Sequence, residues 1–328
     1  MGRGYYSIAM TINHIHLGEG SIDVPVFDIV GKKPGKTLLV TGGMDGDEYA
    51  GMEACYRTIK RINAKDIAGR IIIIPIVNTP GFWEETSSNP MDGKFPKFVG
   101  VGKALGSPTQ RLVHWLVNSY AKHADLWLDL HGGSLTECIS PYLWAWETGV
   151  DPIDSLVKEY IQANAPGFGI FERQRFPTGK AATLARAGCG YILGEAGGMG
   201  SRAEADIHQH ETWISAALEL LEIMQSGQRK KGFNPVMYKQ KTITRRTHPV
   251  LYAKTDFFRS TFPGLWYPYS PTIRTVQKGE PLGVVRSLDG KKSTVMAARH
   301  TGQILWIKSG LRAMPTDDLV AIAYNTII

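Results

Sequence analysis

The chain has 328 residues, of which 43% are hydrophobic and 20% are charged, a composition typical of an ordinary globular protein with a large core. Its length favours two domains over one. The net charge of +7 comes from scattered lysines and arginines, with tight basic runs only at 228–231 and 244–246. Because a nucleic-acid groove needs clustered basic residues, we expect no nucleic-acid partner and favour a small anionic substrate.

Strands and helices alternate along the first two thirds of the chain. Polarity that alternates with a period of two indicates strands, and apolar residues that recur every three or four positions indicate helices. The predicted elements, in chain order, are strands at 5–16 and 21–30, a turn at 33–36, a strand at 37–41, a helix at 47–63, a strand at 71–77, a helix at 107–122, strands at 125–130 and 141–147, helices at 151–164 and 180–187, a strand at 190–195 and a helix at 203–226. This order predicts an α/β fold, with a mostly parallel mixed sheet and helices on both faces.

Two other segments differ in composition and periodicity from this alternating pattern. Residues 78–107 are rich in Pro, Gly, Asn and Ser and show no period, and so long a loop in a compact domain usually serves function. After about residue 232 the apolar runs become short, turn residues become frequent and helical periodicity disappears. We therefore expect an α/β domain at 1–232 and a small all-β domain at 236–328.

The cysteines and the apolar runs bear on location. Cys55, Cys138 and Cys189 show no CxxC spacing and cannot all pair with one another, which argues against a disulfide scaffold and for a reducing compartment. No run approaches the eighteen apolar residues of a membrane span, and the first residues lack a signal-peptide pattern. We expect a cytoplasmic protein with no membrane partner, and the oligomeric state stays open, a homo-oligomer included.

Three predicted strands end in acidic or histidine side chains followed by small residues. Asp45 and Glu48 follow the first core strand, His131 ends the second, and Glu195 ends the third. Ligands of open α/β sheets bind beyond the carboxyl ends of the strands, and two neighbouring carboxylates repel unless a cation lies between them. The chain can therefore supply three metal ligands, Asp45, Glu48 and His131, and a general base, Glu195, for metal-assisted hydrolysis.

Each of these residues also has a structural interpretation. Asp45 can cap the helix that begins here, a single histidine at a strand end is more often structural than a ligand, and Glu195 can be a solvated loop carboxylate. Asp129 lies two residues before His131 and so points to the same sheet face, as a candidate acceptor for the ring N–H of His131 that does not face the metal. A buried carboxylate bonded to backbone amides is an equal alternative for Asp129.

The three strand ends carry a family resemblance. The segments are Gly42-Gly-Met-Asp-Gly-Asp-Glu48, Asp129-Leu-His-Gly-Gly133 and Glu195-Ala-Gly-Gly198. In order and separation they resemble the motifs of the succinylglutamate desuccinylase/aspartoacylase family, zinc amidohydrolases related to zinc carboxypeptidases. The resemblance covers nearly the whole chain and implies a zinc-carboxypeptidase-like fold with a C-terminal β domain. It also implies Glu48 and His131 as metal ligands and Glu195 as the base that activates water.

Two departures from the family pattern concern the metal and the substrate. Asp45 stands where the family has its first histidine ligand. An aspartate can bind zinc through oxygen, and this harder ligand set also admits manganese or iron. We expect one Zn²⁺ per chain, with Mn²⁺ or Fe²⁺ as alternatives. The family's Asn-Arg pair, whose arginine binds a substrate carboxylate, is missing from the segment around Lys94. The candidates for substrate binding are Lys94, Arg173, Arg175, Arg186 and Tyr267.

These features lead to one expected function and one alternative. We expect a metal-dependent hydrolase of carbon–nitrogen bonds other than peptide bonds. It would remove an acyl group from a small N-acyl amino acid or a related amide, with a metal-activated water and Glu195 as general base. The alternative is a non-catalytic family member that binds a small anionic ligand in the same cleft, which the aspartate at position 45 and the missing Asn-Arg pair favour. The retained Glu48, His131 and Glu195 favour the enzyme.

Overall fold

The computed structural model describes residues 6–224, 249–270 and 273–327. The helices are α1 (Tyr49–Arg61), α2 (Thr79–Trp83), α3 (Pro108–Ser119), α4 (Asp151–Asn164), α5 (Lys180–Arg186) and α6 (Glu204–Leu220), with single 3₁₀ turns at Ala64–Asp66, Pro96–Phe98 and Ala121–His123. None of the helices in the described ranges is long and apolar enough to cross a membrane.

The strands run from the first described residues to the last. They are β1 (Ser7–His16), β2 (Ser21–Val30), β3 (Lys33–Gly42), β4 (Ala68–Ile74), β5 (Leu126–His131), β6 (Glu137–Ile139), β7 (Tyr142–Glu147), β8 (Phe168–Arg173), β9 (Gly190–Glu195), β10 (Val250–Arg259), β11 (Gly264–Pro268), β12 (Thr275–Val276), β13 (Pro281–Arg286), β14 (Ser293–Ala297), β15 (Gly302–Lys308), β16 (Arg312–Ala313) and β17 (Asp318–Ile327).

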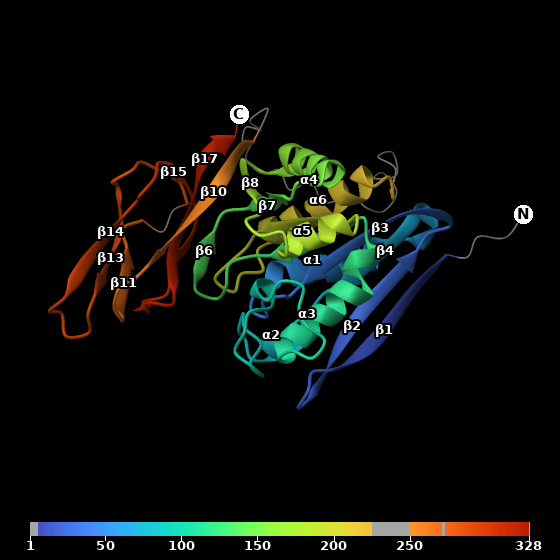
Figure 1. Cartoon of the computed structure of the whole chain (residues 1–328), viewed down its shortest axis with the longest axis horizontal. Helices are drawn as coiled ribbons and strands as arrows, with labels where there is room; N and C mark the ends of the chain where they lie inside the picture. Colours follow the sequence, from blue (N-terminus) through green and yellow to red (C-terminus); the bar gives the residue numbers. More distant parts are fainter. Residues whose placement is uncertain (1–5, 225–248, 271–272, 328) are drawn as a thin grey trace, which may run out of the picture.

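One large mixed sheet dominates the molecule (Figure 1). Within the described residues its strand order is β1-β2-β4-β3-β5-β9-β7-β8-β10-β17-β15-β12, with β6 paired to β15. The centre, formed by β4, β3, β5 and β9, is parallel, whereas β2 joins β4 and β7 joins β9 in antiparallel fashion. The predicted α/β class with a mixed sheet is therefore confirmed.

Helices cover both faces of the sheet, and the strand residues alternate between two apolar cores. Leu38, Val40 and Leu128 pack on the face covered by α1, α4 and α6. Leu39 and Trp127 pack on the opposite face, beneath α3 and α5. Because successive side chains of a strand point to opposite faces and both faces are covered, the runs at 38–40 in β3 and 126–128 in β5 are apolar at every position.

The C-terminal strands continue the large sheet and also form a second one. β10 pairs with β8 in parallel and with β17 in antiparallel fashion. In the described ranges, β14, β13, β11 and β16 form a separate four-stranded sheet, whose apolar core also includes residues of β10, β15 and β17. The predicted division between 1–232 and 236–328 falls outside the described residues, as do the basic runs at 228–231 and 244–246, and the division stays a prediction.

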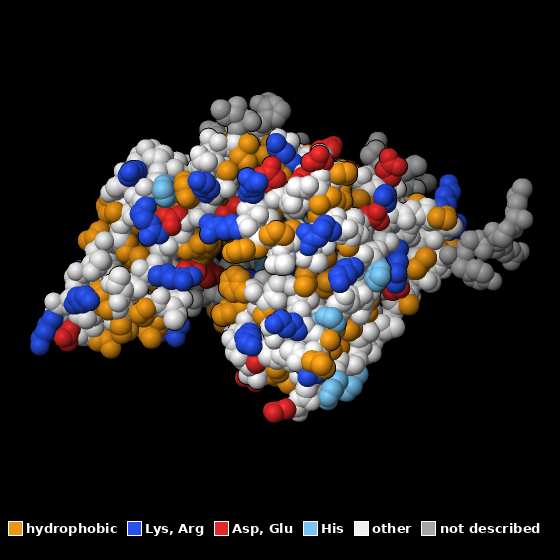
Figure 2. All heavy atoms as spheres, in the orientation of Figure 1, with side chains coloured by type: hydrophobic (Ala, Val, Ile, Leu, Met, Phe, Trp, Pro, Cys, Tyr) orange, Lys and Arg blue, Asp and Glu red, His pale blue; other side chains and the backbone are white. Residues whose placement is uncertain are grey.

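Figure 2 shows a hollow between the C-terminal strands and the α/β part of the molecule. Lysine and arginine side chains are scattered over this face and do not gather into one basic groove.

Some predicted elements differ from those observed. The predicted turn at 33–36 is wrong, because this segment belongs to β3 and pairs with β4 across a register shift between Lys33 and Thr37. The sequence analysis also missed β8, whose place between β7 and β10 depends on distant pairing. The loop at 78–107 contains the short helix α2.

Candidate active site

Three neighbouring strands carry the candidate site at their carboxyl ends. In register, Gly42 of β3 lies beside Leu130 of β5, and His131 of β5 lies beside Glu195 of β9. After β3 the chain turns toward α1 through Gly46, where a Cβ atom would lie 2.1 Å from the backbone of Gly81. A glycine is therefore required for this turn to pass so close to the start of α2.

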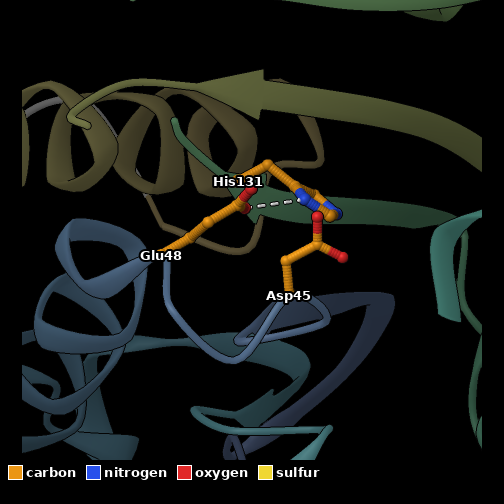
Figure 3. Close-up of side chains that lie close together, drawn as sticks. All are labelled: Asp45, Glu48 and His131. Atoms are coloured by element: carbon orange, nitrogen blue, oxygen red, sulfur yellow. Dashed lines mark hydrogen bonds and ion pairs between the residues drawn. The ribbon is translucent and has the colours of Figure 1, made fainter. Parts of the chain in front are cut away.

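Asp45, Glu48 and His131 converge in a buried cluster (Figure 3). Each offers one ligand atom, and these atoms all lie within 4.8 Å of one another. The three side chains are almost fully buried. The Nδ1 atom of His131 lies 2.9 Å from Oε2 of Glu48, which also accepts a hydrogen bond from the Gly132 N–H at 3.0 Å. The arrangement fixes one carboxylate against one imidazole, with a second carboxylate facing both.

Asp129 holds the other side of the imidazole. Its Oδ2 atom lies 3.3 Å from Nε2 of His131 and accepts a hydrogen bond from the Tyr191 hydroxyl at 2.9 Å, and its Oδ1 accepts one from Thr41 at 2.5 Å. Burial raises the pKa of Asp129, but the charge and hydrogen bond of His131 outweigh burial and leave that pKa lowered. Likewise, burial lowers the pKa of His131, but Asp129 and Glu48 raise it well above its usual value.

Lys97 is part of the cluster, and the sequence analysis missed it. Its ammonium contacts Oδ2 of Asp45 as an ion pair, and its side chain is 31% exposed. Burial lowers the pKa of Lys97, but the charges of Asp45, Glu48 and further carboxylates raise it well above its usual value. Burial raises the pKa of Asp45 to about 6, against the opposing effect of Lys97. The only signal in the sequence was the position of Lys97 in the long loop, three residues after Lys94.

Glu195 faces the cluster from the end of β9. Burial raises its pKa to about 8, with the charge of His131 opposing this rise and that of Glu48 adding to it. A carboxyl group with so high a pKa keeps its proton near neutral pH in this arrangement of charges. A cation added beside Glu48 would lower this pKa and release the proton.

A second lysine lies behind Asp129. Lys180 is buried between the rings of Trp127 and Tyr191, with its ammonium 5.4 Å and 5.2 Å from their centroids. It contacts the Tyr191 hydroxyl at 3.4 Å, and that hydroxyl donates to Asp129. Burial lowers the pKa of Lys180. Contacts from Lys180 through Tyr191 and Asp129 therefore connect α5 to the imidazole of His131.

The predicted substrate-binding residues do not gather at one point. Lys94 donates from Nζ to Ser107 Oγ at 3.0 Å. Arg173 and Arg175 are exposed at and just beyond the end of β8. Arg186 ends α5 and precedes β9, so it lies near the start of β9, at the opposite edge of the sheet from Glu195.

Tyr267 lies on β11 with its ring 39% exposed. The guanidinium of Arg286 stacks over this ring, 5.4 Å from its centroid.

The buried cluster fits a divalent cation on its chemistry. Two carboxylates and an imidazole form a donor set that zinc, manganese and iron accept. Neither oxygen of Asp45 has a hydrogen-bond partner of regular geometry among the described residues, although the ammonium of Lys97 lies close to one of them. Buried polar atoms without such partners are costly, which is consistent with a place that another group completes.

The chain resembles known proteins in sequence and in fold. N-alpha-acetyl-L-2,4-diaminobutyric acid deacetylase of Halomonas elongata is 36% identical over 123 residues, a match that spans 38% of this chain and 36% of that protein. A succinylglutamate desuccinylase/aspartoacylase structure from Rhodobacter sphaeroides is similar with a TM-score of 0.81 at 19% identity, over 99% of this chain and 98% of that one.

The product-bound structure of the ectoine utilization protein EutE (DoeB) from Ruegeria pomeroyi is similar with a TM-score of 0.76 at 22% identity, over 97% of this chain and 98% of that one. The family model described as the succinylglutamate desuccinylase/aspartoacylase catalytic domain matches residues 34–221, more than half of the chain. The chain therefore belongs to the succinylglutamate desuccinylase/aspartoacylase family.

Proposed function

We propose that the chain is a metal-dependent amidohydrolase that removes an acyl group from a small N-acyl amino acid or a related amide. The observation that carries the proposal is the convergence of Asp45, Glu48 and His131 within 4.8 Å, with Glu195 in register beside His131. Membership of the family and the match to a relative named as a deacetylase support the reaction class.

Asp45, Glu48 and His131 would hold one zinc ion per chain, with manganese or iron as alternatives. Such an ion would polarise the amide carbonyl and lower the pKa of a water molecule. The Nδ1 atom of His131 would face the ion, because Nε2 faces Asp129. Asp129 would then fix the ring orientation, as outer carboxylates do for histidine ligands.

Glu195 would serve as the general base and then as the general acid. It takes one proton from the water as the water oxygen attacks the amide carbon. It returns that proton to the nitrogen as the carbon–nitrogen bond breaks, so that the amine leaves neutral and the acyl group leaves as an acid. For this role Glu195 must be ionised at the start, and its present pKa of about 8 would have to fall when the cation arrives.

Lys97 would supply the positive charge that a small anionic substrate needs. Among the described lysines and arginines, it is the one that contacts the cluster directly. With a metal ion bound at Asp45, the Lys97 ammonium would become available for a substrate carboxylate or for the developing oxyanion. Arg173, Arg175 and Tyr267 remain candidates for more distant substrate contacts.

The three proposed metal ligands and the proposed base Glu195 all lie within 1–232, and we assign the hydrolase activity to this predicted domain. The proposed boundary leaves 236–328 as the C-terminal β domain.

The first test is elemental analysis of metal per chain in protein purified without chelators. The native chain should carry about one divalent ion, and Asp45→Ala should lose it, because the variant removes one of three ligands. Asp66→Ala, which changes an exposed aspartate, is the matched control. A full metal content in Asp45→Ala would exclude Asp45 as a ligand.

The second test measures turnover with a panel of N-acetyl and N-succinyl amino acids. Glu195→Gln should retain the metal but lose at least about a hundredfold in kcat, the usual contribution of a general base. Undiminished turnover in that variant would refute the role given to Glu195.

The second candidate function is a non-catalytic binder of small anions. The ion pair between Lys97 and Asp45 favours it, because a lysine already neutralises part of the cluster. A native chain that takes up no zinc, manganese or iron, and that binds N-acyl amino acids unchanged, would establish this alternative.

A further inference from the structure

A second cavity lies beside the active site, on the far side of Tyr49. Its volume is about 700 Å³, within the range of pockets that hold small ligands. It shares Tyr49 and Gly200 with the small hollow next to Glu48, but Asp45, Glu48, His131 and the other residues of the proposed chemistry do not line it. The proposed hydrolysis therefore gives this cavity no role.

Aromatic rings from two elements line the cavity. Tyr49 and Tyr56 come from α1, and Phe82 and Trp83 come from α2. The ring of Phe82 packs edge-on against Tyr49, with centroids 6.5 Å apart, and against Trp83, with centroids 5.0 Å apart. Trp83 is 77% exposed, so packing within the fold does not account for this large apolar side chain.

Three glutamates also line the cavity. Glu53 lies on α1, and Glu84 and Glu85 directly follow α2. Glu53 is paired with Arg57 at 3.0 Å, whereas in the described part of the chain Glu84 and Glu85 form no ion pair. Burial and the nearby charge of Glu85 raise the pKa of Tyr49, and the backbone of Glu85 has a left-handed φ of 50°. The rings and the carboxylates of Glu84 and Glu85 thus line the same cavity.

Arg202 is the one basic residue that lines the cavity, against three glutamates. The lining therefore favours positive over negative ligands. Aromatic faces attract cations through their quadrupole, most strongly for tryptophan, and they favour weakly hydrated organic cations over metal ions. A neutral apolar ligand would gain nothing from the glutamates, and an anion would be repelled by them.

We propose that this cavity binds a small organic ammonium ion, with its alkyl groups against Trp83 and Phe82 and its charge facing Glu84 and Glu85. The site is independent of the proposed hydrolysis, because it uses none of the residues assigned to it. Tyr49, which lines the cavity, directly follows Glu48 in the chain, so the cavity adjoins the cluster but shares none of its residues.

The test is isothermal titration of the full-length protein with choline, with butylammonium, and with the uncharged tert-butyl analogue of choline. At least one cation should bind saturably, and the uncharged analogue should bind at least about tenfold more weakly than choline, because it lacks the charge that the rings and carboxylates attract. The proposal is overturned if neither cation binds, or if the uncharged analogue binds as tightly as choline.

Removing a negative or a positive charge from the cavity should change the affinity for the cation in opposite directions, which a merely structural role would not produce. Trp83→Ala and Glu85→Gln should each weaken binding of the cation by about fivefold, and Arg202→Gln should strengthen it, since repulsion is removed. All three side chains are exposed, so we expect the variants to fold, as circular dichroism will show. Phe98→Ala, which removes another exposed ring outside the cavity, is the control and should leave binding unchanged. Equal shifts in Glu85→Gln and Arg202→Gln would refute the charge argument.

Discussion

Replacing Lys97 with methionine should tighten the binding of a divalent metal ion. The Lys97 ammonium contacts the Asp45 carboxylate that would bind the ion. A metal must therefore break this ion pair and then tolerate the ammonium nearby. Methionine keeps the apolar length of the side chain and removes its charge, so that both costs disappear.

The size of the effect follows from the geometry. Two unit charges about 4 Å apart interact by about 4 kcal/mol at the effective dielectric constant of a protein. Lys97 is 31% exposed and can turn toward solvent, which recovers much of this energy as hydration. We therefore expect a net gain of about 1.5–3 kcal/mol, which corresponds to a dissociation constant lower by about ten- to a hundredfold.

The assay is competition for Zn²⁺ and Mn²⁺ against a chromophoric chelator at fixed pH and ionic strength. Lys103→Met removes a charge from an exposed lysine of the same loop and controls for the change in net charge. Native protein, Lys97→Met and Lys103→Met should also be compared in thermal unfolding, so that a folding defect is recognised. Equal or weaker metal binding by Lys97→Met would show that Lys97 does not compete with the metal and would refute the reasoning.

Two further predictions concern the surroundings of the cluster. Asp129→Asn should weaken metal binding by about tenfold in the chelator assay, because it removes the charge that holds Nε2 of His131, whereas Asp125→Asn at the other end of the same strand should leave it unchanged. Buried His210, whose pKa burial lowers to about 4, stays neutral in the folded chain, while the unfolded chain protonates it below about 6.5. The unfolded state therefore binds more protons at acidic pH, and His210 should cost the fold about 2 kcal/mol between pH 7 and pH 5. Urea unfolding at both values should show this loss in the native chain relative to His210→Gln, and an identical pH dependence in the two proteins would contradict it.

The residues of the candidate site that lie at strand ends could be predicted from the sequence. Parallel neighbours β3, β5 and β9 end at one edge of the sheet, so Asp45, Glu48 and His131 had to come close together once those strands were identified. Lys97 could not be found in this way. Its loop has no period, and the position of its ammonium depends on how 78–107 folds over the strand ends.

The same limit explains the other differences. Lys94 stood closest to the family's missing arginine in sequence, yet its ammonium turns to Ser107. Arg186 is near Glu195 in sequence, but a strand of six residues separates them by about 20 Å in space. The strand β8 exists because β7 and β10 pair with it on either side, and no local pattern in Phe168–Arg173 records that pairing. Spacing along the chain predicts which residues share an edge, but long-range contacts decide which of them meet.

The charges of the site give a reason for the lysine that lies beside the proposed metal ligands. The carboxyl groups of Asp45, Glu48 and Asp129 lie in one cluster, where the ammonium of Lys97 pairs with Asp45 and the ring of His131 lies between Glu48 and Asp129. A ligand set with histidine at position 45 would have one negative charge fewer and no carboxylate for Lys97 to pair with. The aspartate therefore makes the cluster more anionic, and in the proposed function Lys97 would offset that charge until a metal ion binds. In the proposed function, Asp45 and Lys97 would therefore act together: the lysine would offset the change of ligand and, with the metal bound, would turn its charge toward the substrate.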